Sequence, residues 1–187
     1  LQARPHDPQI RLELAQLLMR EKNYPEAIRE LQTVLKQRPG NPQAAAALAR
    51  IHLWTKNYPE AIRLFEKLKL RRLLAADQMA DLARAYSWNR QYPQAIATYE
   101  GMLRIVPRPQ AELYMEMGDV YLYAKNLPAA VVNYRKALEL DPVSDAVQKK
   151  LALALSWNKQ DEEALALLLP LQKKLPADKE IALELVR

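Results

Sequence analysis

The amino-acid sequence is poor in the residues that most enzyme centres need. Its 187 residues include no cysteine, three glycines and two histidines, His6 and His52. Without cysteine the chain forms neither disulfides nor thiolate metal sites, which is compatible with any compartment, an oxidising one included. Three glycines are too few for a glycine-rich phosphate loop, and two histidines do not make a metal-spaced cluster. We therefore predict a protein that is not an enzyme, with no catalytic residue, no metal and no cofactor.

The sequence also lacks long apolar segments. No stretch of about 20 apolar residues is present, so we expect no membrane span. Residues 1–7 do not combine a basic region with an apolar one, so we predict no signal peptide within them. Because no initiating methionine is present, we expect the chain to be part of a longer protein. The formal net charge of +6 suits acidic partners without requiring them.

What the sequence does contain is an internal repeat, in a chain rich in alanine and leucine. The string NYPEAI occurs at 23–28 and again, 34 residues later, at 57–62. Related strings follow at 91–96 (QYPQAI), 126–131 (NLPAAV) and 160–165 (QDEEAL). A period of this length is typical of stacked supersecondary units, and abundant alanine and leucine favour helices. The sequence therefore predicts an all-α repeat array.

The residues around these strings share a fixed pattern, which we number from position 1 at Pro8 and at the equivalent residue of each later repeat. Position 20 is Ala27, Ala61, Ala95, Ala130 and Ala164. Position 8 is Ala15, Ala49, Ala83, Gly118 and Ala152. Position 32 is Pro39, Leu73, Pro107, Pro142 and Pro176. The pattern resembles the tetratricopeptide repeat (TPR) family, which implies a right-handed solenoid of stacked helix-turn-helix repeats.

The resemblance covers nearly the whole chain and predicts a single TPR array over residues 1–187. Five complete repeats are expected at 8–41, 42–75, 76–110, 111–144 and 145–178. Residues 1–7, with Pro5 at position 32, resemble the tail of a preceding repeat, and 179–187 resemble the start of a first helix. One hairpin cannot bury its own apolar stripe, so stability depends on the stacking of neighbours.

Two departures from the pattern affect the second helix of a repeat. Leu73 stands where the helix-ending proline is expected, which predicts either a longer helix or a changed stacking angle. The third repeat carries one extra residue, which we place in 106–110, where Pro107 and Pro109 disfavour a helix. In all five repeats Asn or Gln at position 16 is expected to cap the second helix, and in four of them Pro at position 18 fits its first turn.

The first helix of each repeat presents positions 9 and 13 opposite its packing face. In the TPR family this face lines the concave groove, so the resemblance implies that ligands bind there. The candidates are Gln16, Arg50, Arg84 and Asp119 at position 9, and Arg20, Trp54, Trp88, Tyr123 and Trp157 at position 13. Two interpretations of the aromatic row stay open. The rings either stack on sugars or anchor a peptide, or they pack over the first helix of the next repeat.

Two other ligand sites are less favourable. The carboxylate clamp of chaperone-binding TPR proteins needs lysine, asparagine and arginine where this chain has residues such as Leu12, Ala47 and Glu116, so we do not expect that mode. A basic cluster on the second helix of repeat two comprises Arg63, Lys67, Lys69, Arg71 and Arg72. Glu60 and Glu66 are interleaved with it, so we interpret it as solvated convex surface and do not expect nucleic acid binding.

A short phrase narrows the resemblance. LARAYSWN at 82–89 is echoed by LALALSWN at 151–158. Both are similar to variants in bacterial envelope proteins, among them the periplasmic TPR arrays of Gram-negative exopolysaccharide export proteins, which precede an outer-membrane β-barrel. The resemblance implies a scaffold whose partner is a polysaccharide-modifying enzyme, another secretion component or the polysaccharide. Two alternatives stay open: a peptide-binding TPR adaptor in the cytoplasm, and a carbohydrate-binding module that uses the aromatic row.

Overall fold

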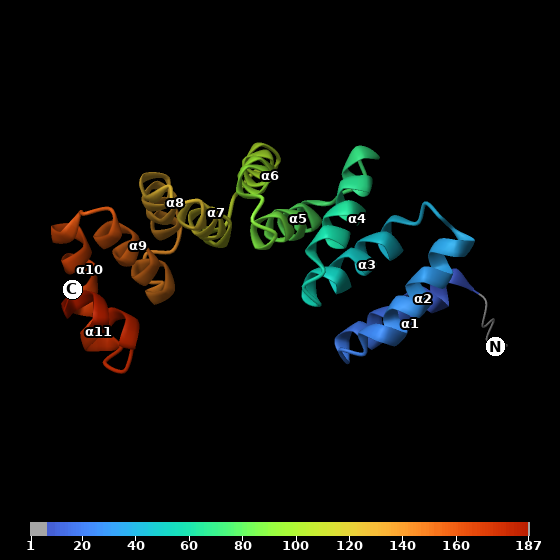
Figure 1. The fold of residues 1–187 in the computed structure, drawn as a ribbon, viewed down its shortest axis with the longest axis horizontal. Helices are drawn as coiled ribbons and strands as arrows, with labels where there is room; N and C mark the ends of the chain where they lie inside the picture. The colour runs from blue at the N-terminus through green and yellow to red at the C-terminus, as the bar shows by residue number, and fades with distance from the viewer. Residues whose placement is uncertain (1–6, 187) are drawn as a thin grey trace. The chain divides into compact units, whose positions relative to one another are not determined.

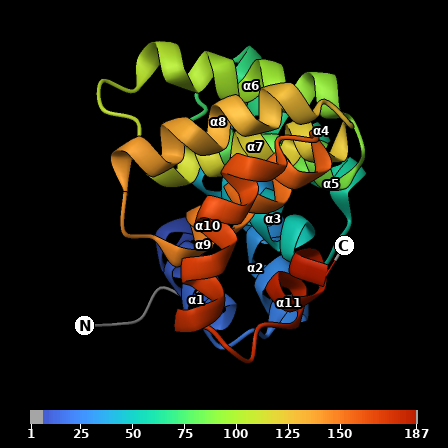
Figure 2. The same ribbon diagram turned by 90° about the vertical axis from the view of Figure 1, so that its left-hand side faces the viewer.

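The structure, a computed structural model, describes residues 7–186, and within them the chain forms eleven helices and no strand (Figure 1, Figure 2). The helices are α1 (Pro8–Arg20), α2 (Tyr24–Gln37), α3 (Pro42–Trp54), α4 (Tyr58–Leu70), α5 (Ala76–Trp88), α6 (Tyr92–Ile105), α7 (Ala111–Tyr123), α8 (Leu127–Leu140), α9 (Asp145–Trp157), α10 (Asp161–Lys174) and α11 (Lys179–Val186). The expected all-α class is confirmed. Of the predicted repeat tail at 1–7, Pro5 and His6 lie outside the described residues.

The chain divides into two compact units, unit 1 (Leu1–Thr98) and unit 2 (Tyr99–Arg187), with the division inside α6. In unit 1, α1 packs on α2 and α3 on α4, while α2 and α4 each contact the first helix of the following repeat. In unit 2, α7–α8 and α9–α10 form equivalent hairpins, and α11 packs on both α9 and α10. Each unit thus contains stacked helix-turn-helix repeats, and each expected repeat start is the first residue of a helix. The grouping of five complete repeats into a single array stays a prediction.

Small side chains allow the two helices of a repeat to approach closely. Ala15 at position 8 and Ala27 at position 20 are fully buried in the first repeat, as are their equivalents in the second. In the fourth repeat position 8 is Gly118, and a Cβ added there would lie 2.5 Å from a ring carbon of Tyr134. Atoms cannot approach that closely in a packed core, so this glycine makes room for the ring.

Every turn between the two helices of a repeat contains a basic residue in the left-handed conformation. At position 15, φ lies between 59° and 62° in all five repeats. We call these residues the turn cations: Lys22, Lys56, Arg90, Lys125 and Lys159. In the second repeat Lys56 N donates to Leu53 O at 3.1 Å and Asn57 N to His52 O at 2.8 Å. This is the Schellman helix end, which usually takes glycine, and a side chain in the left-handed region costs about 1–2 kcal/mol.

The second helix of repeat two does not run long. Helix α4 ends at Leu70, although Leu73 replaces the expected proline. Arg72 has a φ of 57°, and Leu73 N donates to Leu68 O at 3.0 Å. The expectation of a longer helix is therefore wrong, because a left-handed turn ends α4 without proline. Residues 106–110 are non-helical, as their two prolines predict.

The position-16 residues cap the second helices less often than expected. Asn126 accepts a hydrogen bond from Ala129 N at 3.2 Å at the start of α8. The side chains of Asn23 and Asn57 make no such bond to α2 and α4. Nδ2 of Asn57 instead lies 3.4 Å from Nδ1 of His52, so this side chain joins the two helices of its repeat.

Candidate functional site

In unit 1, Arg50 at position 9 links the second repeat to the third. Nε of Arg50 donates to Oδ2 of Asp81 at 2.6 Å, and a second nitrogen of Arg50 pairs with Asp77. Nη1 of Arg84 donates to the other oxygen of Asp81 at 3.0 Å. Burial lowers the pKa of Arg50, but the hydrogen bonds and charges of Asp81 and Asp77 outweigh it and raise the pKa above its usual value. Asp81 is only 8% exposed, so it holds both guanidinium groups in place.

Unit 2 contains the corresponding link with reversed charges. Asp119, also at position 9, accepts hydrogen bonds from the Tyr134 hydroxyl and from Nζ of Lys150, each at 2.6 Å. Lys150 occupies the same repeat position as Asp81 in unit 1. Burial raises the pKa of Tyr134, and the hydrogen bond to Asp119 raises it further, so the hydroxyl remains a neutral donor. Asp119 and the two arginines, predicted as ligand contacts, already have partners inside the protein.

A polar hollow of about 390 Å³ lies between the first two repeats of unit 1 and is also lined by Gln78 of the third repeat. Four predicted site residues line it: Gln16, Arg20, Arg50 and Trp54. Position 9 is here Gln16, and position 6 of the next repeat is Ala47, so no ion pair fills the space between the first helices. Among residues 7–186, Arg20 has no hydrogen-bond or ion-pair partner for its side chain. Its charge is therefore available to a ligand.

The position-13 tryptophans of unit 1 are both packed and exposed. The ring centroid of Trp54 lies 5.9 Å from that of Tyr24, and Trp88 lies 5.7 Å from Tyr58. Each tyrosine begins the second helix of the preceding repeat, so these ring pairs join consecutive repeats. Each indole residue nevertheless keeps 49% of its surface exposed. Packing and ligand contact are thus compatible at these positions.

In unit 2, Tyr123 and Trp157 are 56% and 37% exposed. Nε1 of Trp157 donates to Glu184 on α11 at 3.4 Å, so this indole does contact the first helix of the next repeat. The nine predicted site residues fall into two sets. Six of them, Gln16, Arg20, Arg50, Trp54, Arg84 and Trp88, lie in unit 1, and Asp119, Tyr123 and Trp157 lie in unit 2. The hollow in unit 1 brings together four of the nine, Gln16, Arg20, Arg50 and Trp54.

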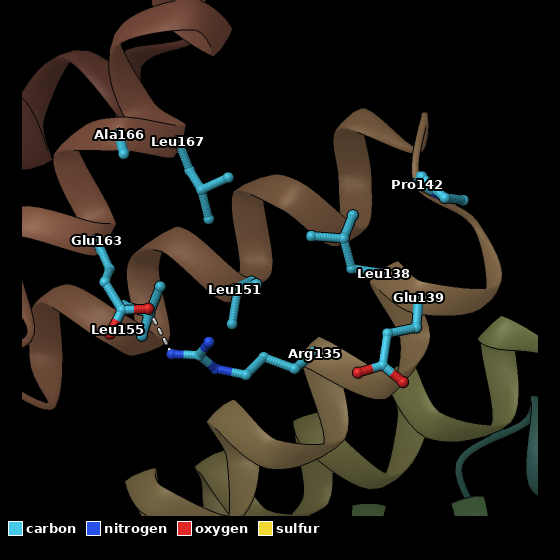
Figure 3. Close-up of a pocket in the computed structure, with 9 residues that line it drawn as sticks. All are labelled: Arg135, Leu138, Glu139, Pro142, Leu151, Leu155, Glu163, Ala166 and Leu167. Carbon is cyan, nitrogen blue, oxygen red and sulfur yellow. Dashed lines mark hydrogen bonds and ion pairs between the residues drawn. The ribbon is translucent and has the colours of Figure 1, made fainter.

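A second pocket, apolar and larger, was not predicted from the sequence. It measures about 540 Å³ and lies between α8, α9 and α10 of unit 2 (Figure 3). Its lining comprises Leu138, Pro142, Leu151, Leu155, Ala166 and Leu167 with the charged Arg135, Glu139 and Glu163. Arg135 and Glu163 form an ion pair of 2.5 Å beside the leucines (Figure 3). The surface is therefore apolar inside and charged at one side.

The equivalent pocket of unit 1 is partly filled by long basic side chains. It measures about 260 Å³ and is lined by Arg63, Lys67 and Arg71 among others. At the repeat positions of Arg63 and Lys67, unit 2 has Ala166 and Pro170. Neither side chain is long or charged, and the unit 2 pocket is the larger of the two. Comparing these two positions between repeats of the sequence would have indicated the unit 2 pocket.

The described residues were also searched for a membrane span, a metal site and free basic surface. Across residues 7–186 none of the helices is both long and apolar enough to cross a membrane. The same part of the chain has no group of three or more histidine, aspartate or glutamate side chains placed to hold a metal. In the basic cluster of α4, Arg63 donates to Glu60 at 2.8 Å and Lys69 pairs with Glu66 at 3.0 Å. Part of the positive charge of that cluster is therefore neutralised locally.

Comparisons with known proteins agree with the repeat pattern. Family models described as tetratricopeptide repeat match residues 1–38, 18–76 and 111–144, together more than half of the chain. The chain belongs to the tetratricopeptide repeat family. A curated relative of this TPR chain, Bacteriophage adsorption protein A of Escherichia coli (strain K12), is 38% identical over 71 residues. The match covers 37% of this chain and 7% of that protein, so the TPR chain corresponds to a small part of its relative.

Solved structures similar to this TPR chain share its fold. MamA from Desulfovibrio magneticus RS-1 matches with a TM-score of 0.82 at 18% identity, over 92% of this chain and 97% of the other. YrrB, described as a TPR protein with an unusual peptide-binding site, matches with a TM-score of 0.80 at 18% identity, over 96% and 92%. At this identity the likeness shows the fold alone. TPR proteins are generally non-enzymatic scaffolds that bind protein partners, and this chain is a TPR-type protein-interaction scaffold.

Proposed function

We propose that this chain is the partner-binding region of a bacterial exopolysaccharide export protein and that it works in the periplasm. The two SWN phrases at 87–89 and 156–158 support this assignment, because they are similar to phrases in periplasmic TPR arrays. The partner is a polysaccharide-modifying enzyme or another component of the secretion apparatus. The complete reading frame is expected to encode an export signal, and cell fractionation is expected to place the protein in the periplasm. A cytoplasmic full-length protein would contradict the proposal and favour the alternative of a cytoplasmic peptide-binding adaptor.

The polar hollow of unit 1 is the observation that carries the scaffold function. Arg20 offers a cation that has no polar partner among residues 7–186, and Trp54 offers an exposed ring face. The amide side chains of Gln16, Gln43 and Gln78 both donate and accept hydrogen bonds, as a peptide backbone requires. The hollow therefore suits an extended protein segment with an acidic side chain opposite Arg20. YrrB, described by its peptide-binding site, supports a peptide as the kind of ligand that this fold accepts.

Arg20→Glu tests this site without breaking a side-chain hydrogen bond or ion pair within residues 7–186. The matched control is Arg29→Glu, which makes the same charge change on the exposed face of α2. The immobilised chain is expected to retain a polysaccharide-modifying enzyme from a periplasmic extract, identified by mass spectrometry. Retention is expected to be lost with Arg20→Glu and kept with Arg29→Glu. Equal retention by both variants would exclude the hollow as the partner site.

The exposed tryptophans favour direct carbohydrate binding as a second candidate function. Trp54 and Trp88 each keep 49% of their surface free. Indole faces stack on sugar rings through their apolar surface and leave the ring hydroxyls to polar neighbours. Tryptophan fluorescence is expected to change when an oligosaccharide is added, and Trp88→Ala is expected to reduce that change. An unchanged spectrum across neutral and charged oligosaccharides would count against this candidate.

A further inference from the structure

The turn cations occupy a conformation that a lysine or arginine adopts at a cost. Their φ values lie between 59° and 62°, and all five residues are exposed. Glycine would adopt the same turn without strain. The repetition of a costly choice in every complete repeat calls for a compensating role of the positive charge.

Interaction with the helix dipole accounts for only part of this preference. A cation near the end of a helix is favoured by the partial negative charge there. The preceding residue, position 14, would serve that purpose without strain, because its φ lies between −76° and −88°. Position 14 is Glu21, Thr55, Asn89, Ala124 and Asn158, and none of these is basic. The positive charge is thus confined to the left-handed residue, which projects from the turn.

In unit 1 the turn cations alternate with aromatic pairs. Lys22 is two residues before Tyr24, whose ring contacts Trp54, and Trp54 is two residues before Lys56. The same connection runs from Lys56 through Tyr58 and Trp88 to Arg90. We call this set the turn edge: Lys22, Tyr24, Trp54, Lys56, Tyr58, Trp88 and Arg90. It lies in the strongly basic unit, which has 16 basic and 9 acidic residues.

We propose that the turn edge of unit 1 binds an acidic polysaccharide, with sugar faces on the exposed indoles and carboxylates on the turn cations. The inference rests on the second candidate function, carbohydrate binding, and names its ligand class. Single-stranded nucleic acid is bound by basic grooves that follow its backbone and by aromatic rings on which its bases stack, so it is the competing ligand in the test below. Here single cations are separated by ring pairs. That spacing suits a chain whose charges alternate with uncharged ring faces.

The test uses ligands that differ only in charge. Binding of hexamannuronate and of neutral mannohexaose to the full chain is measured by calorimetry and by tryptophan fluorescence. The triple variant Lys22→Gly/Lys56→Gly/Arg90→Gly removes the charges and relieves the strained turns. The control triple Arg29→Gln/Lys36→Gln/Lys67→Gln removes the same net charge from exposed positions on the second helices. Urea unfolding of each variant separates lost binding from lost folding.

We expect hexamannuronate to bind at least about tenfold more tightly than mannohexaose, and the glycine triple to weaken it by a similar factor. The unfolding midpoint of the glycine triple is expected to stay equal or rise, and the control triple is expected to bind within about twofold of the unmodified chain. Equal losses of hexamannuronate affinity in the glycine triple and the control triple would overturn the proposal, because net charge alone would then explain the binding. Equal binding of mannohexaose would overturn it while leaving carbohydrate binding intact, whereas no oligosaccharide binding would contradict both. Tighter binding of a thymidine hexanucleotide would identify a nucleic-acid surface and overturn it.

Discussion

Units 1 and 2 are built from the same repeat but link their first helices with opposite charges. In unit 1 a cation at position 9, Arg50, pairs with Asp81 at position 6 of the next repeat. In unit 2 the anion Asp119 is at position 9 and Lys150 at position 6. Exchanging repeats between units would place like charges together. We infer that the sign of this link helps to specify which repeats stack on each other.

The two units also differ in charge as a whole. Unit 1 has 16 basic and 9 acidic residues, a net charge of +7, whereas unit 2 has 12 and 13, a net charge of −1. The pocket between neighbouring second helices follows the same trend, since it is basic in unit 1 and apolar in unit 2. A single repeat pattern therefore supports two surfaces with different partners. Electrostatic ligands are expected at unit 1 and apolar side chains at unit 2.

The largest expected effect comes from Asp81→Lys. This change puts a third cation against Arg50 and Arg84 at a site where Asp81 is only 8% exposed. We expect a loss of about 3 kcal/mol in the free energy of unfolding, measured by urea denaturation with circular dichroism. The control is Asp77→Lys, because the Asp77 side chain is 64% exposed and leaves Arg50 its bond to Asp81. That variant is expected to lose less than about 1 kcal/mol.

The same reversal in unit 2, Lys150→Asp, tests how far the two links are equivalent. It puts a second carboxylate beside Asp119, but the Lys150 side chain is 36% exposed, so solvent screens the repulsion. A loss of about 1 kcal/mol is expected. If Lys150→Asp proved as costly as Asp81→Lys, burial would not be what separates the two links.

For Gly118→Ala we expect a smaller loss than for Asp81→Lys. The new Cβ would lie 2.5 Å from the Tyr134 ring, whose hydroxyl is fixed by Asp119. Overpacking of this kind costs about 1–3 kcal/mol, although alanine regains up to about 1 kcal/mol of helix propensity. We expect a net loss of about 1–2 kcal/mol by thermal and urea unfolding.

The double variant Gly118→Ala/Tyr134→Leu separates crowding from other effects of the alanine. It gives the fourth repeat the pairing of the first, Ala15 with Leu31, where both residues are fully buried. The alanine is expected to cost less stability in the Tyr134→Leu background than in the unmodified chain. If Gly118→Ala costs the same with and without the tyrosine ring, the close contact is not its cause.

The sequence was sufficient to predict the repeat because the small residues at positions 8 and 20 recur at a fixed period. It did not predict the inter-repeat links. Arg50 and Asp81 are 31 residues apart, and they meet only when the first helices of two repeats lie side by side. We expected Arg50 to bind only a ligand, because the sequence pattern was considered one helix at a time. The unit 2 pocket was missed for a related reason, since it depends on the lengths of side chains contributed by three helices.

Lys56→Gly and Lys125→Gly test the left-handed turn cation, which occurs in both units. Each replaces a left-handed lysine, with φ of 62° and 61°, by the residue that this turn accepts without strain. We expect each to raise the free energy of unfolding by about 0.5–1 kcal/mol, since the loss of charge at the helix end offsets part of the relief. Lys56→Gln, which keeps the strain and removes the charge, is the control and is expected to lower stability slightly. A decrease with both glycine variants would mean that the charge outweighs the strain.

The smallest expected effect is a change in pH dependence with His52→Leu, which gives the second repeat the residue of the fifth, Leu155. Burial lowers the pKa of His52, as does the charge of Arg63, while Glu60 opposes them. The neutral ring is thus favoured in the folded chain, and the unfolded chain binds the proton more tightly. This contribution to stability is present above the unfolded pKa of about 6.5 and is lost as pH falls through the lower folded pKa. Urea midpoints measured from pH 8 to pH 5 are expected to fall less steeply for His52→Leu than for the unmodified chain, and parallel curves would show that His52 is not responsible.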